Sequence, residues 1–480
     1  MKKILPAVIL FLFVHESFSQ VQTNNYRDAL HFIDTWIEAQ RDFLDIPSVS
    51  VAIVKDQEII WSKAYGMADT EKKVAASTNT IYSICSITKL FTSIAIMQLY
   101  DAGKLRLDDN IETILPHYNL KQQYKESGAI TIRSLLTHSS GLPRESDYPY
   151  WTGPDFPFPS QMQLNAKLSE QQTLYPSSTV FQYSNLGMSL LGEVVEKISG
   201  QPYDVYVAEN FLKPLRLTST NTYLPANEWG KKMAIGYGAV KREGARDKVN
   251  LFDAKGIKAA AGFSSNVEDL ARFASWQFRL LNNGSAEILK SSTLKEMHRV
   301  QWVDPDWKTF WGLGFSISQP DGITIVGHGG SCPGYRTTLQ LDAKEKMAYT
   351  VMINAGGESP DFIAKEISEI FSKIPKDKTP KINNINLEQY AGTYSAQPWG
   401  SEKIVTAWYG DLVMLNLPND NPDESMTVLQ HVSGDTFRRV RKDKTLAEEI
   451  IFIKDNSGKV MKIFQHSNYS TRIISDKKKV

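Results

Sequence analysis

The sequence contains little cysteine and almost no net charge. Only two of its 480 residues are cysteines, and none of its eight histidines has the ligand spacing that would complete a zinc site with them. We therefore expect neither a metal nor another cofactor. The 54 basic residues nearly balance the 53 acidic ones, for a net charge of +1, which gives no basic surface field for nucleic acid. The expected partner is a small-molecule or peptide substrate, while the oligomeric state stays open.

Long hydrophobic runs are also scarce, and the longest one lies at the N-terminus. Lys2 and Lys3 precede an apolar run over 4–14, and small residues at 17 and 19 come just before Gln20. This order is typical of a signal peptide, and the run is too short for a stable membrane anchor. We predict cleavage after residue 19 and an exported protein, periplasmic or secreted; a short buried N-terminal helix is the alternative. No cysteine follows the run, so no lipid attachment is expected.

The rest of the chain has an ordinary globular composition, with 42% apolar and 22% charged residues. A helical pattern over 26–44 precedes two β-branched runs, a long block of helices, a group of strands over 312–354 and a helix over 360–374. This order predicts an α+β domain over 20–375, in which an antiparallel sheet formed by the early and late strands is flanked by helices.

The pattern of hydrophobic residues changes in the C-terminal part of the chain. Residues 376–386 are polar and break both periodicities, which indicates a linker. Residues 387–480 contain short strands separated by turns, as expected for a small all-β domain of the barrel or sandwich type.

One candidate nucleophile stands at the start of a buried helix. Ser86 and Lys89 are three residues apart and therefore share a helix face. A helix N-terminus also favours a developing alkoxide. The pattern alone is weak, because Ser292 and Lys295 repeat it.

The segment 147–159 carries five aromatic residues among four prolines. Such a stiffened loop could wall a substrate cleft, and we name Tyr150 and Trp151 as candidate substrate-binding residues. Aromatic side chains folded onto the domain surface are the alternative.

Two further motifs follow the first in order: Tyr183-Ser184-Asn185 and His328-Gly329-Gly330. The set resembles the three motifs of the serine β-lactamase and penicillin-binding-protein superfamily, S-x-x-K, Y-x-N and K/H-T/S-G. The segments 135–142 and 183–192 look like signatures of its class C-like branch, with D-alanyl-D-alanine carboxypeptidase, D-aminopeptidase and esterase relatives. The resemblance spans about residues 26–375 and implies a β-lactamase/transpeptidase-like fold with an all-helical subdomain. The second Ser-x-x-Lys pair, Ser292 and Lys295, follows Tyr183 in the sequence, so the order of the motifs excludes it.

The resemblance implies roles for these residues. Ser86 would attack an acyl carbonyl, with Lys89 or Tyr183 as the base, and we expect neighbouring cations to lower the pKa of Tyr183. Asn185 would hold the substrate amide and fix Lys89. His328 would stand on an edge strand facing the nucleophile.

Backbone groups complete the implied site. The N–H groups of Ser86 and Ser331 would form the oxyanion hole, and Gly329 and Gly330 would line the substrate. β-Lactamases usually carry Lys and then Thr or Ser in the third motif, which bind the substrate carboxylate. Here His328 is expected to be only partly charged, and Gly329 has no hydroxyl. This favours a serine peptidase, with D-amino-acid or cell-wall peptides as candidates, or an esterase. A class C β-lactamase and a non-turnover penicillin-binding sensor are the alternatives.

The resemblance also bears on the two cysteines and on the C-terminus. In the family fold the start of the nucleophile helix faces the end of the third-motif strand, so we predict a disulfide between Cys85 and Cys332; two small buried thiols are the alternative. Residues 387–394 resemble the opening of the small β-rich domains appended to relatives of this branch.

Overall fold

A computed structural model describes residues 25–124, 126–284, 286–375, 385–396 and 400–473. The predicted signal peptide and most of the predicted linker (376–384) lie outside these residues. The chain divides into two compact units. One is formed by residues 45–364, and the other joins the described residues up to Leu44 with those from Lys365 onward.

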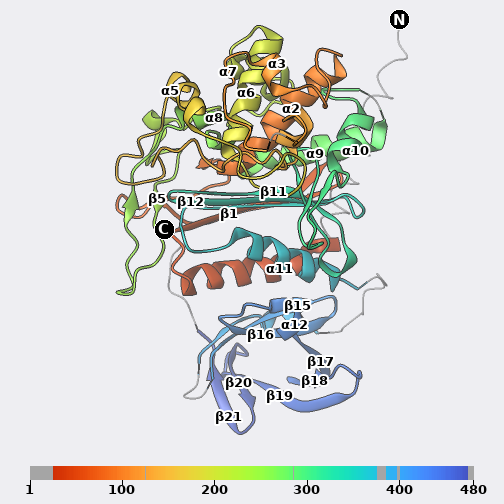
Figure 1. Cartoon of the computed structure of the whole chain (residues 1–480). Helices are drawn as coiled ribbons and strands as arrows, with labels where there is room; N and C mark the ends of the chain where they lie inside the picture. The colour runs from red at the N-terminus through yellow and green to blue at the C-terminus, as the bar shows by residue number, and fades with distance from the viewer. Residues whose placement is uncertain (1–24, 125, 285, 376–384, 397–399, 474–480) are drawn as a thin grey trace, which may run out of the picture. The chain divides into compact units, whose positions relative to one another are not determined.

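A nine-stranded antiparallel sheet forms the centre of the 45–364 unit (Figure 1). Its order is β3-β2-β1-β13-β12-β11-β10-β9-β8, so the earliest strands pair with the latest ones, as predicted. The strands are β1 (Ser48–Lys55), β2 (Glu58–Asp69), β3 (Val74–Ala75), β8 (Trp302–Val303), β9 (Phe310–Trp311), β10 (Ser316–Ser318), β11 (Ile325–Cys332), β12 (Tyr335–Asp342) and β13 (Met347–Ile353). Two two-stranded pairs lie outside it, β4 (Tyr82–Ser83) with β7 (Ser264–Ser265) and β5 (Gly236–Tyr237) with β6 (Lys248–Val249).

Helices cover one face of this sheet, and many belong to a helical subdomain (Figure 1). The α-helices are α2 (Thr88–Asp101), α3 (Ile111–Ile114), α4 (Ile132–Leu136), α5 (Gln161–Lys167), α6 (Asn185–Ser199), α7 (Tyr203–Val207), α8 (Lys258–Ala261), α9 (Val267–Asn283) and α10 (Ser291–His298). Shorter helical turns are η1 (Cys85–Ile87), η2 (Leu168–Glu170), η3 (Ala208–Leu212), η4 (Ala226–Glu228), η5 (Lys255–Ile257) and η6 (Pro320–Gly322). Helix α2 is buried on nearly every side, as its apolar sequence predicts.

The opposite face of the sheet meets the first turn of α11 (Pro360–Ser372). There Thr338 on β12 donates a hydrogen bond to Asp361 at 2.6 Å. The α+β architecture of the unit therefore matches the prediction.

The second unit contains a small antiparallel barrel. Its strands run in sequence order: β14 (Gly392–Tyr394), β15 (Glu402–Trp408), β16 (Asp411–Leu417), β17 (Thr427–Ser433), β18 (Thr436–Val440), β19 (Leu446–Lys454), β20 (Val460–Gln465) and β21 (Asn468–Thr471), with η7 (Leu387–Gln389) before them and α12 (Pro422–Ser425) between β16 and β17. Backbone hydrogen bonds from Ser395 N to Thr471 O (2.8 Å) and from Ile473 N to Thr393 O (2.7 Å) join the first and last strands. The predicted barrel is therefore nearly closed.

The N-terminal helix, residues 25–43, belongs to this second unit. The Trp36 indole donates to Asn419 O at 3.0 Å, and the Tyr409 backbone N–H donates to Asp28 at 2.6 Å. The rings of Phe32 and Trp408 pack edge to face at 5.8 Å. The sequence pattern placed this helix with the main domain, whereas its hydrogen bonds here reach residues near the end of the chain.

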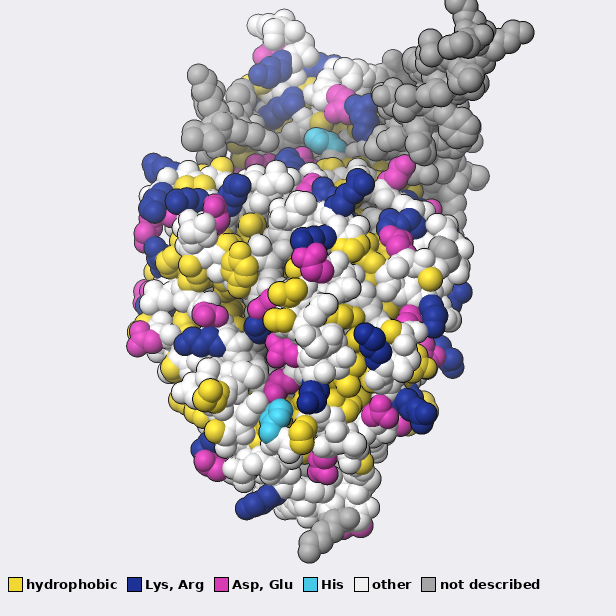
Figure 2. Space-filling model, turned by 90° about the horizontal axis from the view of Figure 1, so that it is seen from above, with side chains coloured by type: hydrophobic (Ala, Val, Ile, Leu, Met, Phe, Trp, Pro, Cys, Tyr) yellow, Lys and Arg dark blue, Asp and Glu magenta, His cyan; other side chains and the backbone are white. Residues whose placement is uncertain are grey.

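The surface charge agrees with the nearly neutral composition. Figure 2 shows positive and negative side chains interspersed on the helical face, without a broad field of one sign.

Within the part of the chain that the structure describes, no helix is both long and apolar enough to cross a bilayer.

Candidate active site

Ser86 lies in the 3₁₀ turn η1, immediately before α2. The preceding residue, Cys85, has a left-handed backbone with φ 49°, an unusual conformation for a residue with a side chain. The Lys89 Nζ lies 3.2 Å from the Ser86 Oγ. The predicted pair is therefore in hydrogen-bond contact.

The Lys89 side chain is completely buried. It also donates a hydrogen bond to Ala260 O at 2.8 Å. Burial, with a smaller contribution from Arg144, holds the pKa of Lys89 well below its usual value, and the nearby Glu145 carboxylate acts in the opposite direction. Lowering the pKa of an amine favours its neutral form, whose lone pair can accept the Ser86 proton.

Two basic side chains lie close to the Tyr183 ring. Lys89 Nζ is 4.8 Å from the ring centroid and the Arg144 guanidinium carbon is 4.9 Å from it. Burial nevertheless raises the pKa of Tyr183, although a hydrogen bond with Ser86 and the charge of Arg144 lower it. The expectation of a lowered Tyr183 pKa was wrong, because loss of hydration outweighs the neighbouring cations.

Asn185 begins α6 and is held by Glu145. Its amide Nδ2 donates to the Glu145 carboxylate at 2.7 Å. Its Oδ1 is buried and has no hydrogen-bond partner among the described residues. Glu145 also accepts from the Tyr150 hydroxyl and pairs with Arg144 at 3.3 Å. The predicted contact of Asn185 with the substrate amide stays a prediction.

His328 lies on β11, where the sheet is locally open. β10 pairs with β11 only from Ile325 to Gly327, whereas β12 continues alongside to Cys332. Among the described residues, the stretch 328–332 therefore has a strand on one side only. The His328 ring is 94% buried, 6.1 Å from the Tyr183 ring and 5.5 Å from Trp311.

Burial, followed by the nearby Lys89, lowers the pKa of His328 to about 3. The ring is therefore neutral across the ordinary pH range, rather than partly charged as expected from its free value. The third motif places no cation at this position.

Alternation along β11 decides which residues face the nucleophile turn. A Cβ on Gly330 would lie 2.3 Å from Ile84 O, so this side of the strand packs directly against the turn. Gly329 faces the other side, where a Cβ would be 3.6 Å from Asp361. Hence the structure gives Gly330 a packing role at the turn, and the Gly329 side of the strand points away from Ser86.

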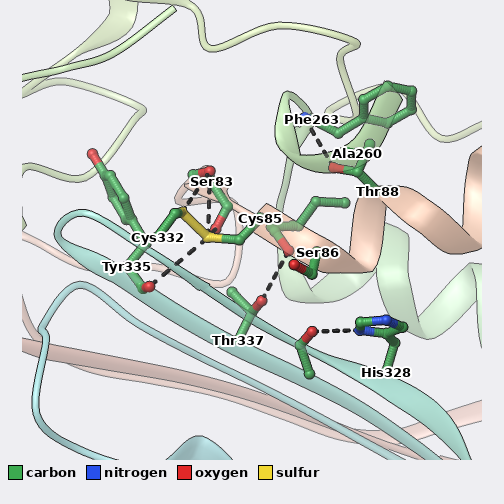
Figure 3. The surroundings of a disulfide bond; sticks show 12 residues. Ser83, Cys85, Ser86, Thr88, Ala260, Phe263, His328, Cys332, Tyr335 and Thr337 are labelled. Carbon is green, nitrogen blue, oxygen red and sulfur yellow. Dashed lines mark hydrogen bonds between the residues drawn. A yellow bond between two sulfur atoms is a disulfide. The ribbon is translucent and has the colours of Figure 1, made fainter. Parts of the chain in front are cut away.

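Cys85 and Cys332 form a disulfide with Cα atoms 5.7 Å apart, within bridging range (Figure 3). The bond connects η1 to the end of β11, and Thr337 on β12 donates to Ile84 O at 3.2 Å beside it. The turn that carries Ser86 is thus tied covalently and by hydrogen bonds to the sheet. Ser331 is exposed next to this bond, and its oxyanion role with the Ser86 N–H stays a prediction.

Tyr150 and Trp151 belong to an aromatic cluster with Phe158 and Phe252. Tyr150 has no exposed surface. Its hydroxyl donates a hydrogen bond to Glu145, and its predicted contact with substrate stays a prediction. Trp151 packs on Tyr150 and Phe158 and is only partly exposed.

Sequence reasoning missed four residues at this site. Arg144 and Glu145 flank Tyr183 and Asn185, and nothing in their loop sequence marks them. Trp311 and His138 pack within 5.1 Å of each other by ring centroids, and His138 lies 4.4 Å from Tyr183. His138 lies in the family signature 135–142, so that segment was the available signal.

No group of three or more His, Cys, Asp or Glu side chains in the described residues is arranged to hold a metal. The site instead combines a serine, a buried amine and a phenol, which is the donor set of a nucleophilic hydrolase.

Comparison with known proteins agrees with this class. The β-lactamase family model matches residues 33–369, so the chain belongs to the β-lactamase family of the serine hydrolase superfamily. A second model, a domain of unknown function (DUF3471), matches residues 376–476.

Relatives cover most of this chain. Protein flp from Staphylococcus aureus (strain MRSA252) is 28% identical over 403 residues, which span 81% of this chain and 73% of the relative. Beta-lactamase-like protein 2 from Dictyostelium discoideum is 28% identical over 331 residues, 68% of this chain and 59% of the relative.

Solved structures share the fold. A penicillin-binding protein homologue from Pyrococcus abyssi, described as octameric, has a TM-score of 0.62 at 24% identity and covers 92% of this chain and 99% of its own. A D-stereospecific amidohydrolase from Streptomyces has a TM-score of 0.58 at 22% identity and covers 70% of this chain and 97% of its own. A β-lactamase/D-alanine carboxypeptidase from Yersinia pestis has a TM-score of 0.61 at 19% identity and covers 72% of this chain and 98% of its own.

Proposed function

We propose that this protein is an exported serine hydrolase that acts through an acyl-enzyme on peptide or ester substrates. The observation that carries the proposal is the 3.2 Å contact between Ser86 Oγ and a fully buried Lys89 amine. A weak hydroxyl nucleophile requires such an adjacent base.

In the proposed first step, Ser86 Oγ bonds to the substrate carbonyl carbon while its proton passes to Lys89 Nζ. The bond to the leaving group then breaks, and the leaving group departs with a proton supplied from the Lys89 and Tyr183 side. Water attacks the resulting ester, which releases the acid and restores the Ser86 hydroxyl. Lys89 is the base that the electrostatics favour, because burial lowers the pKa of Lys89 and raises the pKa of Tyr183.

The substrate class follows from the third motif. A neutral His328 offers no cation to a substrate carboxylate, which supports a peptidase or esterase over a class C β-lactamase. The shared fold with a D-stereospecific amidohydrolase and a D-alanine carboxypeptidase makes peptides with D-residues the first candidates to test.

Labelling and turnover test this proposal together. The purified protein is treated with a fluorophosphonate and with a fluorescent penicillin, and loss of the label is followed over time. We expect Ser86-dependent labelling and hydrolysis of p-nitrophenyl esters or D-amino-acid amides. Penicillin label that persists without turnover would identify a sensor. Efficient turnover of the penicillin would identify a β-lactamase. Identical labelling of wild type and Ser86→Ala would refute Ser86 as the nucleophile.

Export is a separate part of the proposal. A disulfide beside the nucleophile is typical of proteins that fold in an oxidising compartment, in keeping with the signal-like sequence of residues 1–19. N-terminal sequencing of the chain recovered outside the cytoplasm should begin at Gln20. Recovery of an unprocessed chain in the cytoplasm alone would contradict export.

A further inference from the structure

We propose that His328 accepts a hydrogen bond from the substrate, so that the group bound beside it is a neutral N–H donor, such as a carboxamide or a continuing peptide bond, and not a carboxylate or an ester. This inference rests on the proposed function, because it concerns the same site. It assigns the third-motif position an acceptor role, where the family motif most often supplies a cationic donor.

The proton on the His328 ring can be placed from one contact. Its Nδ1 lies 2.5 Å from Gly329 O (Figure 3). A carbonyl oxygen can only accept, so Nδ1 must carry the proton. In a neutral imidazole the other nitrogen, Nε2, then presents a lone pair.

That lone pair has no partner in the structure. His328 Nε2 is buried without a hydrogen bond among the described residues. The ring stands on the same side of β11 as Gly330 and Cys332, the side that packs against the Ser86 turn. A buried acceptor left unpaired is costly, and a substrate N–H would satisfy it.

A second unpaired acceptor lies in the same site. Asn185 Oδ1 is 97% buried by residue and unpartnered, because its amide nitrogen is committed to Glu145. A carboxylate or an ester offers acceptors only, so either would leave both His328 Nε2 and Asn185 Oδ1 without a donor.

Two unpaired donors accompany the acceptors. His138 Nδ1 accepts from the Ser184 backbone N–H at 3.1 Å, so the proton of that ring is on Nε2. This Nε2 and the Trp311 indole nitrogen are buried without partners among the described residues. The Trp311 ring lies 5.5 Å from the His328 ring and 5.1 Å from the His138 ring, so unpaired donors and an unpaired acceptor belong to neighbouring rings. This combination matches an amide, which carries both a donor and an acceptor.

Matched ligands test the acceptor role directly. N-acetyl-D-alanyl-D-alanine and its carboxamide differ only in the terminal group, and each is measured as a competitor of fluorophosphonate labelling at Ser86 and as a substrate. We expect the carboxamide to be preferred by about tenfold or more, as one buried hydrogen bond to an otherwise unpaired group requires.

Three variants separate hydrogen bonding from fold effects. His328→Gln keeps an acceptor and should keep the preference for the amide. His328→Leu removes the acceptor and should bring the ratio of the two ligands close to one. His328→Lys should reverse it in favour of the carboxylate. A purely structural role of His328 would weaken both ligands equally and leave the ratio unchanged, which would overturn the inference.

A fourth variant tests charge repulsion as the cause. If the negative charge of Glu145 sets the preference, Glu145→Gln abolishes it and His328→Leu retains it, and the inference fails. If neither ligand competes with the labelling of Ser86, the inference is refuted, but the proposed function is not. Absence of Ser86-dependent labelling removes the proposed function and the inference with it.

Discussion

At the scale of single residues, burial acts in opposite directions on the two candidate bases. Removing water disfavours the charged form of each group, which lowers the pKa of the Lys89 amine and raises the pKa of the Tyr183 phenol. Both changes favour the neutral form of the side chain. Lys89 can therefore take the Ser86 proton, while Tyr183 keeps its own proton and can donate it.

This assignment predicts the pH profile of a Tyr183→Phe variant. The protonated Lys89 is inactive, so kcat/KM rises with pH through the Lys89 pKa, at a pH well below the ordinary value of 10.5. Tyr183→Phe should lower kcat/KM by about 10²- to 10⁴-fold, the usual contribution of a proton donor, and leave this rise in place. Measurement of kcat/KM from pH 5 to 10 for wild type and Tyr183→Phe tests this assignment of the base. A rise that disappears in the variant would instead make the Tyr183 phenolate the base.

His298, away from the candidate site, predicts acid sensitivity of the fold. Burial lowers its pKa to about 4 from an ordinary 6.5, and its ring packs on Phe315. Between these values the unfolded chain binds a proton that the folded chain does not, so stability falls as pH drops, by about 1.4 kcal/mol per pH unit. His298→Gln should flatten this part of the pH dependence in urea titrations at pH 7, 6 and 5. An unchanged slope would show that His298 is not buried as described.

At the scale of elements, β11 and the η1 turn depend on each other. The strand can approach the turn only because Gly330 has no side chain: a Cβ there would also lie 2.3 Å from Thr337 Oγ1. The same contact brings Cys332 to Cys85 and His328 toward Ser86. The geometry of the nucleophile is therefore set by the sheet as much as by helix α2.

Gly330→Ala should accordingly damage both stability and activity. Its methyl group must displace Ile84 O or Thr337, and such overpacking costs about 1–3 kcal/mol. Gly128→Ala is the matched control, since a Cβ at this exposed position meets nothing within 4 Å. Urea unfolding and fluorophosphonate labelling rates report the two effects. Equal behaviour of the two variants would refute the close approach.

The sequence predicted those parts of the site that short segments define. Ser86 and Lys89 are neighbours on one helical turn, and motif order separated them from the Ser292 copy. Glu145 and Trp311 could not be predicted, because a loop and strand β9, both distant in sequence, bring them to Asn185 and Tyr183. Periodicity likewise found the strands but could not show how β11 faces the turn.

The sign of the Tyr183 pKa shift was missed for a related reason. Its neighbouring cations could be anticipated from the family pattern, but the extent of burial around the ring could not. The neutral state of His328 follows the same logic, since only packing reveals the loss of water.

At the scale of the whole molecule, described residues from the early and the late part of the sequence belong to one unit. The helix 25–43 buries Phe32 against Trp408, and Gln40 donates to Asp420 at 2.8 Å. Lys373, just after α11, pairs with Asp423 at 3.4 Å. The barrel thus has a helical partner from the opposite end of the sequence.

Two phenylalanines on this helix offer a matched test. Phe32 is fully buried, whereas Phe43 is 48% exposed. Phe32→Ala should destabilise the protein by about 3–5 kcal/mol, as expected for a large core truncation, and Phe43→Ala should be nearly neutral. Thermal unfolding and limited proteolysis of the C-terminal unit measure the difference. Similar midpoints for the two variants would contradict the described packing.

The hydrogen bond from Trp36 to Asn419 spans 383 positions of sequence. A ribosome adds about 5–20 residues per second, so Trp36 is synthesised roughly 20–80 s before Asn419. Until then the buried face of this helix, which includes Phe32, lacks the Trp408 side chain that it packs against. An early helix of the described chain can therefore pack in its native place only late in synthesis, and a chain that stops before residue 408 cannot bury it in this way.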